Sequence, residues 1–190
     1  MNYPQIPLEE YCLIIPDHPI PGRPDEDEQG MYRVHPNNIK YSDIDFSVCK
    51  KISTMMIPHI ERYTPQFGDV LIARIGSNAG KVIYFVKDQE PSYLISHFIT
   101  LRCTSPLAAK WLYHYLKTEK AQKDIERMLG EGVMPHLSHR DLRNLMIPVP
   151  DEKTMQELVD SWDALLTEQS ECVKRINELE TIYRTKLSEI

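Results

Sequence analysis

Residues 66–81 read QFGDVLIARIGSNAGK, and this stretch decides the architecture that the sequence predicts. The Gly-Asp pair at 68–69 predicts a tight turn, and residues 70–75 then follow the near-alternating pattern of a half-buried strand. The run GSNAG at 76–80 predicts a second turn before the strand KVIYFV at 81–86. The stretch therefore predicts a β-hairpin, with glycines that let backbone come close to a ligand. The tip residues that can hydrogen-bond or carry positive charge are Arg74, Ser77, Asn78 and Lys81.

An ordinary surface hairpin would show the same pattern, so the hairpin alone does not define a function. A nucleotide-binding loop is disfavoured. Residues 76–81 have one residue too few between their glycines, and Val82 stands where a magnesium-binding Ser or Thr is needed.

The chain of 190 residues allows one globular domain of usual size with some residues left over. The start MNYPQIPLEEY has no basic region followed by an apolar run, and no segment approaches the roughly 20 apolar residues that span a bilayer. The four cysteines form no CxxC pair and are expected to be free thiols. We therefore expect a cytoplasmic protein without a membrane partner.

Charge is distributed unevenly along the chain. Residues 29–150 hold 16 basic and 11 acidic residues, whereas residues 1–28 hold 1 and 7 and residues 151–190 hold 5 and 10. A mildly basic middle permits contact with DNA without requiring it, although the net charge is −6.

The fold class expected from these patterns is α+β: one mixed α/β domain over residues 1–150, followed by a long C-terminal coiled-coil helix over residues 151–190. Ser105-Pro106 provides an N-cap and a first helical residue, and Gly130 a stop, for an apolar-striped helix. The other expected elements are a strand or strand-turn at 7–15, a loop at 16–30, strands near 31–34 and 44–48, a buried strand at 92–101, a short helix at 138–144 and an edge strand at 145–150.

The segment 151–190 carries a heptad seam, with positions spaced alternately four and three residues apart, and has no Gly or Pro. A helix of about 38 residues would be about 57 Å long, too long for one domain to bury, so we expect it to pair with another helix. The alternative is that it folds back as two shorter helices. The seam residues expected at the partner interface are Leu158, Trp162, Leu165, Cys172, Ile176, Leu179 and Tyr183.

The sequence shows no catalytic pattern. No Gly-rich cofactor loop follows a strand, and the Asn-Pro-Pro-aromatic motif of adenine methyltransferases is absent. His136 and His139 lack a Glu or Cys partner at metal spacing, and the acidic run at 25–28 is expected to be a solvated loop. We therefore expect no enzymatic activity, no cofactor and no metal.

Taken in order, these elements resemble a target recognition domain of a type I restriction–modification specificity subunit over almost the whole chain. The motifs that carry the resemblance are PLEEYCLII, FGDVLIARIGSNAGK, SYLISHFITLRC with the helix WLYHYLKTEKAQKDI, GEGVMPHLSHRDLRNLMIPVP, and Gln156 opening a long helix.

The resemblance implies a protein that does no chemistry. It implies sequence-specific binding to double-stranded DNA and association with a methyltransferase (modification) subunit and a restriction/translocase subunit. Family members usually carry two recognition domains, whereas this chain offers one domain and one helix. Two copies paired along the seam would rebuild a two-domain shape, and such a homodimer would read a bipartite palindrome.

Three regions are candidates for DNA contact, because groove readout needs donors and acceptors and phosphate contact needs cations. Arg33 and His35 are weaker candidates, and solvated surface side chains are the alternative for each. The candidates are Arg74, Ser77, Asn78 and Lys81 at the hairpin tip, His136, Ser138, His139 and Arg140 before the short helix, and the basic pair Lys50 and Lys51.

Three other functions stay open. The first is a protein–protein adaptor that acts through the heptad helix. The second is an enzyme with an unfamiliar site. The third is the recognition module of a single-chain methyltransferase–nuclease or of another phage-defence methyltransferase.

Overall fold

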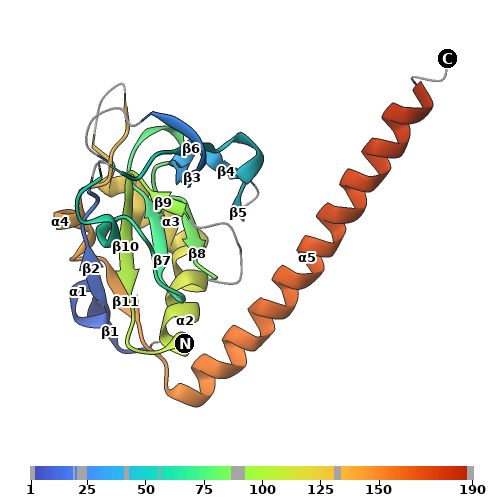
Figure 1. Ribbon diagram of the computed structural model, residues 1–190. Coiled ribbons are helices and arrows are strands. Elements are labelled where there is room, and N and C mark those ends of the chain that lie inside the picture. Colours follow the sequence, from blue (N-terminus) through green and yellow to red (C-terminus); the bar gives the residue numbers. More distant parts are fainter. Residues whose placement is uncertain are drawn as a thin grey trace. The chain divides into compact units, whose positions relative to one another are not determined.

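The computed structural model describes residues 3–18, 20, 25–40, 43–55, 57–86, 93–130 and 134–187. The chain divides into two compact units, Met1–Pro150 and Asp151–Ile190. Figure 1 shows the elements of both units. In chain order they are β1 (Gln5–Pro7), α1 (Leu8–Tyr11), β2 (Leu13–Ile15), β3 (Glu26–Val34), the 3-10 helix η1 (Pro36–Asn38), β4 (Ile39–Lys40), β5 (Asp43–Ile44), η2 (Phe46–Val48), β6 (Lys50–Ile52), η3 (Ile60–Arg62), β7 (Val70–Ala73), η4 (Gly76–Asn78), β8 (Val82–Tyr84), β9 (Tyr93–Ile95), β10 (Phe98–Arg102), α2 (Pro106–Leu116), α3 (Glu119–Met128), α4 (His139–Leu142), β11 (Met146–Pro148) and α5 (Glu152–Leu187).

The expected hairpin is confirmed as β7 and β8, which pair antiparallel with Ile72 opposite Val82. β10 pairs with the other side of β7, and β2 with β10, which gives a four-stranded antiparallel sheet in the order β2-β10-β7-β8. Every residue of β7 is buried, rather than every second one as its near-alternating pattern predicted. Helix α2 packs against β7 and β8 (Figure 1), so most of the hairpin strands are buried, whereas Ser77 and Lys81 at the tip are exposed.

Gly80 closes the hairpin, and two features favour glycine at this position. Its φ of +87° lies in the left-handed region that side chains disfavour. In addition, a Cβ atom at this position would lie 3.0 Å from Cγ2 of Ile125 in α3. The turn at the tip is therefore set by backbone conformation and by packing against a helix.

A second, three-stranded sheet has the order β6-β3-β9, in which β3 pairs antiparallel with β6 and parallel with β9. The short pairs β1-β11 and β4-β5 complete the strands. One core cluster draws on both larger sheets and so joins them. Its buried members are Val34, Ile39, Ile44, Leu71, Ala73, Ile83, Phe85, Ile95 and Phe98.

The segment 7–15 follows the strand-turn alternative rather than one strand, because Leu8–Tyr11 forms a helical turn that buries Leu8 and β2 follows it. Two other expectations for the first half of the domain were wrong. The acidic run is not a loop: Glu26–Glu28 lie in β3, where the Glu26 carboxylate pairs with Lys50 of β6. The strand expected at 44–48 ends at Ile44, because the Asp45 carboxylate accepts the Ser47 amide and starts a 3-10 turn.

Two longer elements that were expected to be continuous are each divided into two. The strand expected over 92–101 splits into β9 and β10, with His97 in a left-handed conformation (φ +66°) between them. The helix expected from Pro106 to Met128 splits into α2 and α3. The Thr118 hydroxyl donates to the Tyr115 carbonyl and caps the new helix by accepting the Ala121 amide.

The C-terminal elements follow the sequence prediction more closely. The expected edge strand is β11, which pairs with β1 at the margin of the domain. Over Glu152–Leu187, α5 is a single helix of 36 residues, so the alternative of two shorter helices is wrong for this range. A helix of this length is about 54 Å long.

Candidate nucleic-acid interface

Two segments that the sequence analysis singled out for DNA contact lie side by side. Ile75 at the hairpin tip forms an antiparallel bridge with His136. The Gly76 amide donates to the Pro135 carbonyl over 3.0 Å, and the Leu137 amide donates to the Arg74 carbonyl over 2.7 Å. These backbone bonds join residues 74–81 and residues 134–140 into what we call the tip–loop surface.

The candidate residues of the tip–loop surface differ in how they are used. Ser77, Lys81, His136, His139 and Arg140 are exposed, and their side chains are available to a ligand. Asn78 and Ser138 are instead partly buried, and their side chains hydrogen-bond to backbone groups of the domain.

The Asn78 side-chain amide donates a hydrogen bond to the Pro36 carbonyl over 2.8 Å, and this bond joins the hairpin tip to η1. The Ser138 hydroxyl accepts the Arg140 amide over 3.2 Å and caps α4. Both side chains therefore hold the surface in shape whether or not they also touch DNA.

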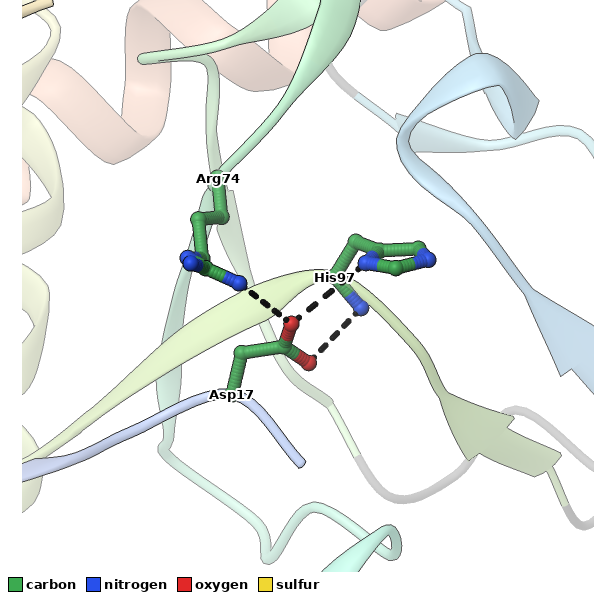
Figure 2. Close-up of polar contacts among 3 residues, drawn as sticks. All are labelled: Asp17, Arg74 and His97. Atoms are coloured by element: carbon green, nitrogen blue, oxygen red, sulfur yellow. Dashed lines mark hydrogen bonds and ion pairs between the residues drawn. The ribbon is translucent and has the colours of Figure 1, made fainter. Parts of the chain in front are cut away.

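Asp17 contacts Arg74 of this surface, and Figure 2 shows the polar contacts that it makes. Its side chain is 3% exposed, and its carboxylate accepts a hydrogen bond from Nη1 of Arg74 over 3.1 Å. It also accepts a hydrogen bond from the backbone amide of His97 over 2.9 Å, and Nδ1 of His97 lies 3.4 Å from Oδ2 without hydrogen-bond geometry. One buried carboxylate thus holds both the arginine at the hairpin tip and the left-handed turn between β9 and β10.

His35 extends this cluster toward η1. Its ring packs edge-on against that of His97 with centroids 5.0 Å apart, and its Nδ1 accepts the Asn37 amide over 3.2 Å. Burial, helped by His97 and Arg33 and opposed by Asp17, lowers the pKa of His35. The ring is therefore neutral near pH 7 and carries its proton on Nε2, which makes it a hydrogen-bond donor without charge.

The basic pair on β6 has partners within its own sheet. Lys50 pairs with the Glu26 carboxylate, and Lys51 donates to the Glu28 carbonyl over 3.0 Å. The Lys51 ammonium also lies 5.0 Å from the centroid of the Tyr32 ring. These contacts position the two cations on the β6-β3 pair, apart in sequence and in sheet from the tip–loop surface.

Sequence reasoning missed Asp17 and His97. Asp17 reaches its partners across 57 and 80 residues, and no local pattern predicts contacts of that separation. His97 did leave a signal, because Ser96-His97 is a polar pair within the apolar run SYLISHFITL.

Two further features bear on the chemistry. Among the described residues, no group of three or more His, Cys, Asp or Glu side chains is placed to hold a metal ion. No helix within the described part of the chain is long and apolar enough to cross a membrane.

The fold is that of type I restriction–modification specificity subunits. The chain superimposes on the S subunit from M. genitalium with a TM-score of 0.60 at 14% identity, covering 86% of this chain and 39% of that one. It superimposes on the HsdS subunit from Thermoanaerobacter tengcongensis with a TM-score of 0.59 at 16% identity, covering 90% of this chain and 43% of that one. It also superimposes on a chain from a structure that describes complex assembly and conformational transition of the type I R-M system. There the TM-score is 0.63 at 18% identity, covering 92% of this chain and 44% of that one. This chain thus spans less than half of each neighbour.

The sequence places the chain within a family. The model of the type I restriction modification DNA specificity domain matches residues 17–181, and the chain belongs to this family. No curated protein matches the sequence. The match confirms the family resemblance, and the family's role is DNA sequence specificity. The structure and its likeness to the solved S subunits confirm the fold class drawn from the sequence.

Proposed function

We propose that the chain is a non-catalytic specificity subunit that directs an adenine methyltransferase subunit to a DNA sequence in a type I-like restriction–modification system. The observation that carries the proposal is the family match over residues 17–181, which includes the tip–loop surface and most of α5. A restriction/translocase subunit is a further proposed partner, and the proposed location is the cytoplasm.

The tip–loop surface supports a role in DNA binding. Lys81 and Arg140 are exposed cations suited to phosphate contact. His136 and His139 are exposed side chains that can donate or accept at base edges. Backbone bonds hold the two segments together, so these groups are presented on a preformed surface.

The long helix supports a role in assembly. Several large apolar side chains on its seam are exposed within the chain, at about half to two thirds of their area, which is unusual for a surface helix. A second helix packed on the seam would cover them. The residues are Leu165, Ile176, Leu179 and Tyr183, at 59%, 55%, 49% and 65% exposed.

A second copy of the chain is the proposed occupant of this seam. An antiparallel pair of identical helices has two-fold symmetry, and it would carry one recognition domain at each end. The same helices would dock the methyltransferase subunit. The DNA site of such a homodimer is a bipartite palindrome, because protein symmetry maps onto half-site symmetry.

One observation favours a second candidate, the protein–protein adaptor. Residues 151–190 hold 10 acidic and 5 basic residues, and the globular unit, residues 1–150, holds 17 basic and 18 acidic residues and so has no basic excess. In this alternative the helix binds a partner protein and the globular unit binds no DNA sequence.

The experiment that tests the proposal is a map of methylated bases. The chain is co-expressed with the adenine methyltransferase subunit of its own system, and the DNA is sequenced by a method that detects modified bases directly. The proposal predicts a bipartite palindrome. If the methylated sequence were bipartite but asymmetric, the proposed DNA recognition would stand and the proposed homodimer would be excluded.

The matched control is the same methyltransferase subunit with a different specificity subunit. If the control produces methylation and this chain produces none, the adaptor becomes the better account.

A further inference from the structure

Arg74 is held in place more firmly than a surface arginine at a hairpin tip would be. Its backbone amide donates to the His97 carbonyl over 2.8 Å, and its carbonyl accepts the Leu137 amide. Its guanidinium donates Nη1 to Asp17, a carboxylate that is itself buried. Backbone and side chain are thus both fixed by contacts within the domain.

The remaining donors of Arg74 are free to meet a ligand. Within the described residues, the Arg74 guanidinium has no acceptor other than Asp17. The side chain is 37% exposed, and its Nε and Nη2 edge makes no hydrogen bond to the described residues. This edge presents two parallel N–H donors, the arrangement that matches paired acceptors.

The ion pair with Asp17 bears on whether Arg74 contacts a phosphate or a base of the DNA. A phosphate contact depends on positive charge and tolerates a flexible side chain. A base contact depends on donor geometry, and a carboxylate that orients the guanidinium improves that geometry while it offsets the charge. The contact with Asp17 therefore favours base readout by Arg74 over phosphate binding.

Polar residues near His97 and Gly76 are also suited to base contacts. The imidazole of His35 is neutral yet offers an Nε2 donor, because Nδ1 accepts the Asn37 amide. Asn37 itself is exposed and carries both a donor and an acceptor. The cations suited to phosphates, Lys81 and Arg140, belong to the exposed part of the tip–loop surface.

We propose that Arg74 reads a guanine within the recognised DNA sequence, and that Asp17 is the positioning residue that holds it for this contact. Nε and Nη2 would donate to O6 and N7 of the guanine in the major groove, the commonest specific arginine contact. This inference rests on the proposed function, because it requires the chain to direct methylation to a sequence.

The test uses the full chain together with the methyltransferase subunit and compares the methylated motif of each variant with that of the wild type. In Arg74→Ala, we expect one guanine position of each half-site to lose its preference by roughly 5- to 150-fold, while the other positions keep theirs. Arg74→Lys is expected to relax the same position, because lysine cannot make the bidentate contact. Lys81→Ala is the control, with a lower methylated fraction at all sites and an unchanged motif.

Asp17→Asn tests the positioning role. Asparagine still accepts the His97 amide but no longer orients Arg74 by charge, so we expect relaxation at the same guanine position. If Asp17 only screened charge, this variant would bind all sequences more tightly with the motif unchanged. If its role were only structural, the melting temperature would fall and the motif would stay the same. Either of these results overturns the positioning role.

Two results separate the inference from the function on which it rests. An unchanged motif in Arg74→Ala, or an equal loss at every site in a folded chain, overturns base reading by Arg74 while leaving the proposed function intact. If Arg74→Ala gives too little methylation to define a motif, binding of the purified complex to single-base variants of the wild-type site decides by the same criterion. Absence of methylation with the wild-type chain contradicts the proposed function itself.

Discussion

Asp69 and Arg102 form a bidentate ion pair that joins the turn before β7 to the end of β10. Nε of Arg102 lies 2.8 Å from Oδ1 of Asp69, and Nη2 lies 2.9 Å from Oδ2. The carboxylate also accepts the Gln66 amide over 2.7 Å and is 1% exposed. This contact explains why an aspartate precedes the hairpin, and it raises the pKa of Arg102.

Replacement of Asp69 by asparagine should destabilise the globular unit. The amide keeps an acceptor for Gln66, but Arg102 loses its counter-charge, and breaking a buried pair costs about 3 kcal/mol. The free energy of unfolding in urea measures the effect. The matched control is Asp124→Asn, which breaks the exposed pair with Arg127 and should cost under about 1 kcal/mol. Equal losses in the two variants would contradict this account of the pair.

The stability of the domain should fall on acidification through His35. Folding lowers the pKa of His35 below its usual value of about 6.5, so the unfolded chain binds this proton more tightly. The stabilising contribution is therefore complete above about pH 6.5 and is lost as the pH falls toward the lower, folded value.

The matched variant is His35→Asn, because asparagine keeps the cap of η1 but does not titrate. The free energy of unfolding in urea is measured at two pH values, one near neutrality and one about one unit below the ordinary histidine pKa. Between these two values it should fall less for the variant than for the wild type. An equal drop would mean that protonation of His35 does not affect folding.

Lys81 should contribute charge rather than specificity. Lys81→Ala in the complex with the methyltransferase subunit should weaken binding to all DNA sequences alike. It should also reduce the slope of log K against log salt concentration by about one unit. The control is Lys153→Ala, an exposed lysine on α5 that pairs with Glu157. A change of motif in Lys81→Ala, or an unchanged salt slope, would remove Lys81 from the phosphate contacts.

Self-association should depend on the seam of α5. Ile176→Glu together with Leu179→Glu places two charges on the exposed apolar face, so the homodimer should dissociate while the single chain keeps its fold. Thr181→Glu is the control, because Thr181 lies on the opposite side of the heptad. Sedimentation equilibrium over a range of concentrations gives the mass independently of shape. A wild-type chain that stays monomeric at high concentration would rule out the homodimer.

The sequence predicted the elements whose signals are local. Turn residues and alternation within 66–81 were enough for the hairpin, and an unbroken heptad pattern was enough for α5. The split of 92–101 into two strands was not predictable in this way. Its apolar residues suit one continuous strand, and the break at His97 arises because β9 pairs with β3 whereas β10 pairs with β7.

The same limit applies to the candidate site. The hairpin tip and the loop before α4 were each recognisable from residue type, but their union through Ile75 and His136 is a tertiary contact. Asp17 lies in a segment whose composition predicted only a loop, and its role depends on two distant partners. Local patterns thus identified donors and cations, whereas the carboxylate that orients them required the fold.

The central claim is that the globular unit, residues 1–150, chooses the DNA sequence. The most direct measurement exchanges this unit for that of another family member with a known, different recognition sequence, keeps α5 of this chain, and maps methylated bases in cells. We predict that the methylated half-sites follow the exchanged unit. A motif that stays with α5, or loss of methylation in a folded chimera that still binds the methyltransferase subunit, would contradict the claim.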